Sequence, residues 1–262
     1  MFKIFNGISL LGVYLSAILL VLLALAFGYL IGRYMRRHHS RGDDASLGSA
    51  VAATLGLLAF MLALTFNMTA ERFAHRKALL LEEVNAIGTT FLRADFLQEK
   101  ARQQAHALLV EYATLRSHDP ATITAEDFRV AIARSDEIHS ALWQLVEQGL
   151  QDNDSELRLK AFYEPLNQVI DLHTMRLQVG AEYQIPTPIW MALYTITALA
   201  VFGIGVQLGL NARGSIPVAL SMSLAFALVI LMIADLDRAN EGLLLVDQGP
   251  MQALAEKLRV SD

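Results

Sequence analysis

Four long hydrophobic runs constrain this chain more than any other feature of its sequence. They cover residues 8–32, 47–68, 188–210 and 216–234. Each run is about 20 residues long or longer, which is the length that a helix needs to cross the roughly 30 Å hydrocarbon core of a bilayer. Unpaired backbone groups are costly in lipid, so we expect all four runs to be transmembrane helices.

The stretch between the second and third runs is charged and has a helical pattern. Its apolar residues recur at helical spacing on one face, beginning with Phe73, Leu80 and Val84. The sequence therefore predicts an all-α, polytopic membrane protein with a long-helix extramembrane bundle inserted between the second and third spans. The expected divisions are 1–66 for the first two spans, 67–187 for the helical domain, 188–235 for the last two spans, and 236–262 for the tail.

The individual helices of the inserted domain have recognisable boundaries. No break signal follows the second span, so we expect it to continue as one helix to about Arg93. Further helices are expected over 98–116, from the N-cap Thr124 to Gln151, and from Asp154 or Ser155 to Tyr183. In the tail, Leu254 and Leu258 predict a short amphipathic helix at a membrane surface or against a partner.

Composition excludes several classes of function. The net charge of −5 and the lack of a basic stripe argue against nucleic-acid binding. Cysteine is absent, which excludes disulfides and thiolate chemistry. The seven histidines show neither His-x-x-x-His nor His-Glu-x-x-His spacing, so the sequence predicts no metal site. We find no nucleophile motif or phosphate loop, and we predict neither an enzyme, nor catalytic residues, nor a cofactor.

Carboxylates occur at two places that invite a functional interpretation. Glu82 and Glu83 are adjacent, and adjacent helical residues point about 100° apart, so we expect a solvated face rather than a shared proton. Asp235 and Asp237 follow the fourth run, and we expect them at the membrane edge, where Asp235 and Arg238 form an i,i+3 pair.

One face of the second span and of its continuation is the candidate site. The second span is rich in small residues, such as Gly56 and Ala63, which let helix backbones approach closely in lipid. The alternative to a site is the wet outer face of an amphipathic helix. If the face instead lines an aqueous path with a hydrophobic constriction, its residues are these: Phe60, Leu64, Asn67, Glu82, Asn85 and Thr89.

Basic residues in the two short loops give an orientation. Arg33, Arg36, Arg37 and Arg41 lie in or beside the first loop, and Arg213 lies in the second. The positive-inside rule places both loops in the cytoplasm. The termini and the helical domain are then outside, which is the periplasm for a multi-pass protein of a bacterial inner membrane.

Two segments carry a resemblance to a known family. They read LLAFMLALTFNMTAERF over 57–73 and EEVNAIGTTFLRA over 82–94, with Arg76 between them. These segments resemble the signature of a bacterial membrane family of unknown function whose members have a bestrophin-like domain. The layout of two spans, a helical insert, two spans and a short tail is similar over most of the chain.

The resemblance has implications of its own. Bestrophins are pentameric anion channels, so it implies a homo-oligomer in the lipid bilayer that conducts small inorganic ions, with the second spans around the pore. It also implies that the helical insert and the termini are cytoplasmic, against the positive-inside rule. The leading hypothesis is thus an oligomeric ion channel, and the alternative is a non-conducting envelope sensor or scaffold whose helical domain binds a protein partner.

Overall fold

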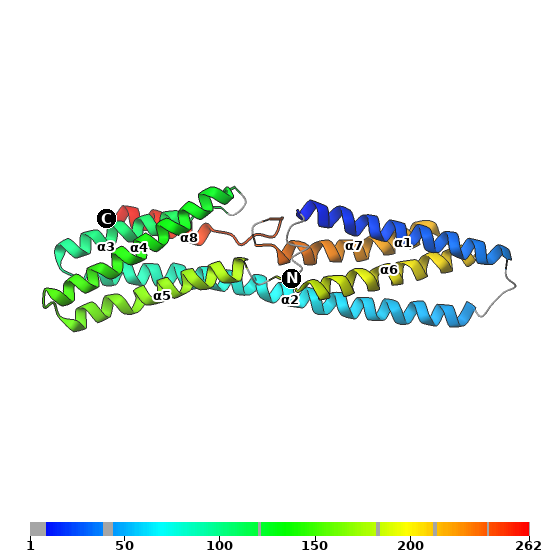
Figure 1. Cartoon of the computed structure of the whole chain (residues 1–262), viewed down its shortest axis with the longest axis horizontal. Coiled ribbons are helices and arrows are strands. Elements are labelled where there is room, and N and C mark those ends of the chain that lie inside the picture. The colour runs from blue at the N-terminus through cyan, green and yellow to red at the C-terminus, as the bar shows by residue number, and fades with distance from the viewer. Residues whose placement is uncertain are drawn as a thin grey trace. The chain divides into compact units, whose positions relative to one another are not determined.

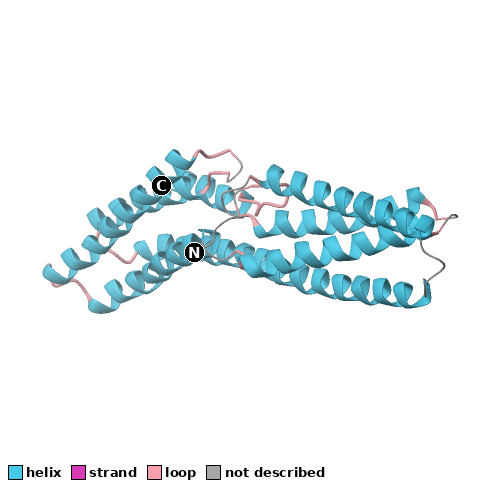
Figure 2. Ribbon diagram, turned by 45° about the vertical axis from the view of Figure 1, so that its right-hand side comes forward, coloured by secondary structure: helices cyan, strands magenta, loops and turns pink. Residues whose placement is uncertain are grey.

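The computed structural model describes residues 9–38, 44–119, 122–181, 184–211, 214–239 and 241–261. In these ranges the chain forms helices and no strand (Figures 1 and 2). The helices are α1 (Leu10–His38), α2 (Asp44–Ala94), α3 (Glu99–Arg116), α4 (Ala125–Gln151), α5 (Glu156–Ala181), α6 (Thr187–Leu210), α7 (Ile216–Asp237) and α8 (Gly249–Ser261).

Within the described residues, α1, α2, α6 and α7 are long and apolar enough to cross a membrane. This confirms the all-α class and the four candidate spans. α2 continues without a break for 51 residues, as the lack of a stop signal predicted. Arg41 and Arg213, which enter the orientation argument, lie outside the described residues, as does Tyr183.

The chain divides into two compact units, and the division falls within α2. Unit 1 comprises Met1–Arg72, Gln184–Arg238 and Gly242–Leu244, and unit 2 comprises Phe73–Tyr183, Ala239–Glu241 and Leu245–Asp262. Unit 1 thus contains α1, the first part of α2, α6 and α7. Unit 2 contains the rest of α2 with α3, α4, α5 and α8.

Glycines in α1 and α6 form the closest helix contact of unit 1. A Cβ added at Gly28 would clash with the carbonyl oxygen of Phe202, and one at Gly205 would clash with that of Leu25. Gly32 and Gly209 meet backbone atoms of the opposite helix in the same way. Small residues allow this approach in lipid, where apolar burial between helices adds little. We call this contact the α1–α6 seam.

The buried hydroxyl groups of unit 1 are bonded within their own helices. Thr65 and Thr69 in α2 donate to the carbonyl oxygens of Met61 and Thr65, at 2.7 and 3.2 Å. Thr197 in α6 and Ser223 in α7 donate four residues back in the same manner, at 2.7 and 2.8 Å. These polar groups therefore need no partner from another helix.

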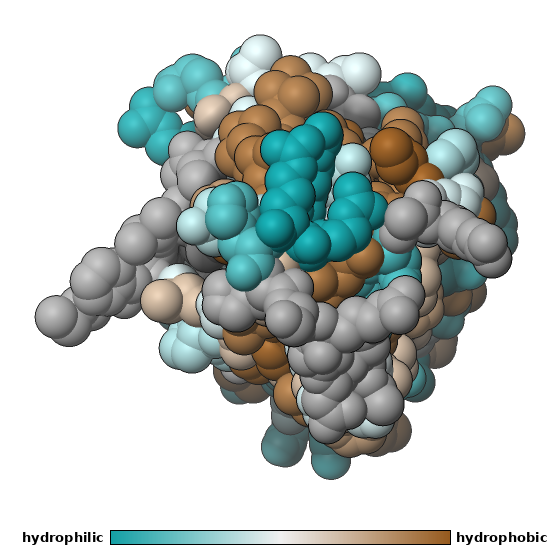
Figure 3. Space-filling view, turned by 90° about the vertical axis from the view of Figure 1, so that its right-hand side faces the viewer, coloured by the Kyte–Doolittle hydropathy of each residue, from teal (hydrophilic) through white to brown (hydrophobic). Residues whose placement is uncertain are grey.

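The end of unit 1 at which α1 finishes is polar. The last turn of α1 contains Arg36, Arg37 and His38. Figure 3 looks onto this end and shows hydrophilic side chains gathered among hydrophobic ones. Cations at a helix C-terminus are favoured by the helix dipole, and Arg side chains at the end of a span reach the lipid headgroups.

Unit 2 has a hydrophobic core to which α2, α3, α4, α5 and α8 contribute. Leu80 and Ile87 of α2, Leu109 of α3, Leu142 of α4 and Phe162 of α5 are fully buried in it. Met251, Ala255 and Leu258 of α8 belong to the same core. The tail helix therefore packs against its own chain, and the expectation of a helix on a membrane surface or a partner is wrong: its apolar face is already covered.

Local signals set the helix boundaries of unit 2. Thr124 caps α4, and its hydroxyl accepts the Asp127 backbone N–H at 3.1 Å, as predicted. Glu126 and Asp127 occupy the first turn, where the dipole favours carboxylates. Pro165 lies inside α5. The start of α4 therefore follows from local sequence signals.

Candidate functional site

The six candidate pore-lining residues lie on one face of α2. Counted at 3.6 residues per turn, they fall within an arc of about 60°. All six are exposed, and the exposed fractions of Phe60 and Leu64 are 59% and 47%. The residues from 60 to 67 lie in unit 1 and those from 82 to 89 lie in unit 2, and we call these six uncovered positions the outer face of α2.

The opposite side of α2 is buried. Leu58, Leu62 and Thr65 in unit 1 lie on it, as do Leu80 and Ile87 in unit 2. Of the four candidate spans, the span in α2 has the smallest buried share, 17% against 28 to 44%. Most of its surface is thus left for lipid or for another chain.

Small residues of α2 also lie on its uncovered side. Ala59 and Ala63 are exposed, and a Cβ added at Gly56 would meet nothing within 4 Å. They do not pack against the rest of their own chain as the glycines of the α1–α6 seam do. The sequence predicted that α2 packs closely against neighbouring helices, and within the described chain these positions have no such neighbour.

The surroundings of Glu83 differ from the solvated face that the sequence predicted for Glu82 and Glu83. Glu82 is exposed, but Glu83 is fully buried in unit 2, because it lies on the opposite side of α2. Its Oε1 accepts from the Tyr112 hydroxyl at 2.6 Å and from Arg116 at 3.1 Å, and its Oε2 accepts from Arg176. The expectation of a solvated face is wrong for Glu83. Its charge is compensated by two guanidinium groups.

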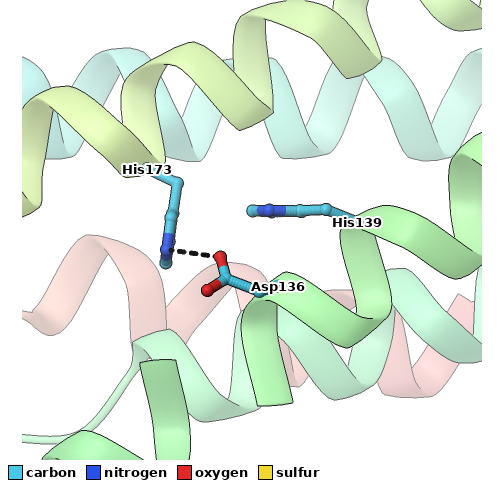
Figure 4. Close-up of side chains that lie close together, drawn as sticks. All are labelled: Asp136, His139 and His173. Atoms are coloured by element: carbon cyan, nitrogen blue, oxygen red, sulfur yellow. Dashed lines mark ion pairs between the residues drawn. The ribbon is translucent and has the colours of Figure 1, made fainter. Parts of the chain in front are cut away.

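Two histidines and an aspartate lie beside this buried carboxylate (Figure 4). Asp136 and His139 come from α4, and His173 comes from α5. His173 Nε2 is 3.6 Å from Asp136 Oδ1, and its Nδ1 is 3.3 Å from the Tyr112 hydroxyl. One ligand atom from each of the three residues lies within 4.8 Å of the others. These residues could hold a metal ion.

Burial changes the acid–base properties of this cluster. It lowers the pKa of His139 and that of His173 to about 4, and Arg116 also lowers the second. Burial raises the pKa of Tyr112 well above its ordinary value, and the charge of Glu83 adds to that effect. At neutral pH the two imidazoles are therefore uncharged, and the phenol keeps its proton.

The sequence contained one signal for this cluster that its histidine spacing did not show. Asp136 and His139 are three residues apart, so they lie on the same side of α4. His173 is 34 positions beyond His139, on another helix. Only the fold brings it to the same place.

The two aspartates at the end of α7 are buried anchors within unit 1. Asp235 accepts the backbone N–H groups of Leu243 and Leu244, at 2.9 and 3.1 Å. Asp237 accepts the N–H of Ile185 at 2.9 Å and pairs with Arg72 at 3.5 Å. Both carboxylates therefore hold backbone N–H groups of nearby loop segments. The sequence predicted only an ion pair between Asp235 and Arg238.

Comparisons with known proteins agree with this architecture. A family model described as the bestrophin-like domain matches residues 18–251. A mutant of a bacterial bestrophin homolog from Klebsiella pneumoniae has a similar fold, with a TM-score of 0.69 at 15% identity over 94% of this chain and 95% of that one. No curated protein matches the sequence.

Two further crystal structures of that homolog are also similar. A second mutant gives a TM-score of 0.69 at 14% identity, covering 94% of this chain and 96% of that chain. The structure solved by Zn-SAD phasing gives 0.65 at 14% identity, covering 94% of each chain. Similarity at this level of identity concerns the fold.

Proposed function

The chain belongs to the bestrophin-like family, and we propose that it forms a homo-oligomeric ion channel in a cell membrane, with one α2 helix from each copy around the pore. The outer face of α2 carries this proposal. Its residues all belong to the helix α2, and the chain itself leaves them uncovered. In a ring of copies this surface would line the axis.

The small residues beside the outer face supply a means of association. Gly56, Ala59 and Ala63 are uncovered and lie at helical spacing next to Phe60 and Leu64. Such residues allow helices of neighbouring copies to approach closely in lipid. We propose that they contact the next copy and so bring Phe60 and Leu64 to the axis.

The order of residues along the outer face suggests how such a pore would work. Phe60 and Leu64 would form a hydrophobic constriction, which can close a pore by excluding water. Asn67 follows, with its amide donating to Glu71 at 2.7 Å, and then Glu82, Asn85 and Thr89. These side chains would give a polar lining.

The resemblance and the acidic residues of α2 predict opposite ion selectivities. The bestrophin resemblance implies anions, whereas rings of Glu71 and Glu82 carboxylates favour cations. Reversal potentials under a salt gradient distinguish the two. Replacing Glu82 with Gln should shift the permeability ratio towards anions if this residue lines the pore.

Conductance of the purified protein in planar bilayers tests the proposal. Leu64→Ala and Phe60→Ala should each raise the open-channel current several-fold by widening the constriction. Leu19→Ala is a matched control, since Leu19 of α1 is also an exposed leucine of a span, at 57%. It should leave the current unchanged. A monomer in detergent and in lipid, or an oligomer that never conducts, would overturn the channel and favour the scaffold.

A further inference from the structure

We propose that Asp136, His139 and His173 form a binding site for a divalent transition-metal cation, such as Zn²⁺, inside unit 2. The site joins α4 to α5, with two buried histidines and one exposed aspartate (Figure 4). It does not depend on the proposed channel function. The proposal rests on the spacing of the three ligand atoms and on two buried nitrogen atoms that make no hydrogen bond within the described part of the chain.

The geometry requires little adjustment. Zinc bonds to nitrogen are about 2.0–2.1 Å long, so ligand atoms around a tetrahedral ion lie about 3.3 Å apart. His173 Nε2 and Asp136 Oδ1 are already 3.6 Å apart. The largest separation within the group is under 4.8 Å. Because Asp136 and His139 share one side of α4, changes of side-chain rotamer are enough to close this distance.

The two imidazole rings each have a buried nitrogen without a hydrogen bond. Among the residues that the structure describes, Nε2 of His139 and Nε2 of His173 have no hydrogen-bond partner. The exposed fractions of these residues are only 7% and 2%. Buried polar atoms are nearly always bonded, so a pair of such atoms beside one carboxylate requires an explanation. A metal ion would satisfy both.

The hydrogen bonds around Tyr112 determine which nitrogen of His173 carries the proton. The Tyr112 hydroxyl donates its single proton to Glu83, at 2.6 Å. Its oxygen must then accept the proton of His173 Nδ1, 3.3 Å away. In the neutral ring this leaves a lone pair on Nε2. That lone pair faces the Asp136 carboxylate, and two acceptors facing each other are stabilised by a cation between them.

This arrangement resembles the surroundings of bound metals in proteins generally. A metal-binding histidine usually donates its other N–H to an oxygen that fixes the ring, and Tyr112 has this role for His173. Two histidines and one carboxylate leave a fourth position for water. The Asp136 side chain is 67% exposed, so an ion can reach the site from solvent.

Nearby charges set a limit on the affinity. Arg116 and Arg176 oppose a cation, but both are bonded to Glu83. Burial keeps both imidazoles neutral, as metal binding requires. We therefore expect a site that is weaker than a structural zinc site with four protein ligands and that binds reversibly.

Metal titration of the full-length, tag-free protein in detergent tests the site. After treatment with a chelator, Zn²⁺ should bind saturably with one ion per chain, measured by competition with a chromophoric chelator. Co²⁺ should give the visible absorption of a tetrahedral site. His139→Ala and His173→Ala should each weaken binding by at least about tenfold.

Two further variants keep the test decisive. Asp136→Asn changes a largely exposed side chain, so it should fold even if the histidine variants do not, and it should also weaken binding at least about tenfold. His75→Ala removes an exposed histidine of unit 2 and should leave binding unchanged. Equal affinity in all these variants, or no saturable binding to the unmodified chain, would overturn the site.

Discussion

The interiors of the two units hold their helices together in different ways. In unit 1 the buried hydroxyls bond within their own helices, and the tightest contact is the glycine seam between α1 and α6. In unit 2 a buried charge connects helices: Glu83 of α2 is bonded to Tyr112 and Arg116 of α3 and to Arg176 of α5. Between the spans of unit 1 the contact depends on shape, and its buried carboxylates lie at the end of α7, whereas unit 2 has a charge network inside its core.

The difference fits the candidate spans of unit 1 in lipid and the extramembrane position that the sequence predicts for unit 2. In lipid, apolar surface is no better buried against protein than against acyl chains, so close packing of small residues must supply the contact. In water, a hydrophobic core forms readily, and a bonded charge network inside it adds a single preferred arrangement. The following predictions test whether unit 1 depends on its glycine seam and unit 2 on its buried charge network, beginning with the largest expected effect.

Replacing Gly205 with Leu should disrupt unit 1 most. The new Cβ alone would clash with the Leu25 carbonyl and lie 2.9 Å from the Tyr29 nitrogen, so α1 and α6 must separate. We expect a loss of at least about 3 kcal/mol, or no folded protein. Yield of monodisperse protein and its thermal unfolding temperature measure this.

Ala26→Leu is the matched control for the seam. This small residue is also in a span, two positions before Gly28 in α1, but its side chain is exposed. The variant should fold as well as the unmodified chain, with a change under about 0.5 kcal/mol. If Ala26→Leu were as damaging as Gly205→Leu, close backbone contact would not be what distinguishes the seam.

Replacing Glu83 with Gln should destabilise unit 2 by about 3–5 kcal/mol, because two guanidinium groups would lose their buried counter-charge. Chemical denaturation followed by the fluorescence of Trp143, in α4, reports on this unit. Glu82→Gln, one residue away on the exposed side, should change stability by less than about 0.5 kcal/mol. Equal effects of the two variants would contradict the division of α2 into two sides.

Acidification should weaken unit 2 in a defined pH range. The pKa values of His139 and His173 are about 4 in the fold against 6.5 ordinarily, so the unfolded state binds more protons between these values. Stability is therefore complete above pH 6.5 and is lost as the pH falls towards 4. In a chelating buffer we expect the unfolding temperature to fall by roughly 5 °C over this range.

The double variant His139→Gln, His173→Gln should remove most of that slope. His75→Gln should retain it, because His75 is exposed. A slope that is unchanged in the double variant would show that other groups cause the pH dependence.

The smallest effect is expected at a hydroxyl of unit 1. Thr197→Val removes a buried hydroxyl that donates within α6 to the Leu193 carbonyl at 2.7 Å, and should cost less than about 1 kcal/mol. Tyr112→Phe removes a buried hydroxyl of unit 2 that contacts Glu83, and should cost about 1–3 kcal/mol. Thermal unfolding of the two variants compares them directly, and a larger loss for Thr197→Val would reverse the comparison.

Most of the helices could be predicted from the sequence, because their signals are local. The apolar runs, the Thr124 cap and the missing stop after the second span each depend on residues close together in the chain. The outer face of α2 could be selected by helical periodicity alone. Its proposed role as a pore lining stays a prediction.

The buried clusters could not be predicted in the same way. Glu83 is three residues after Leu80 and four before Ile87, so helical spacing alone puts it on the apolar side of α2. Which groups neutralise its charge depends on where α3 and α5 pack, and no local pattern specifies that. The tail helix likewise has an amphipathic face whose partner, its own unit 2, is distant in sequence. His173 joins Asp136 and His139 only through the packing of α5 on α4.

The threonines of α2 have a consequence for movement in the membrane. Thr65 and Thr69 carry their hydrogen bonds with them, because donor and acceptor belong to the same helix. If α2 slides or turns against its neighbours in unit 1, these bonds neither break nor need new partners. Resistance to a change of register at these two positions then comes from side-chain packing, and the Arg72–Asp237 pair adds an ionic contact between α2 and α7.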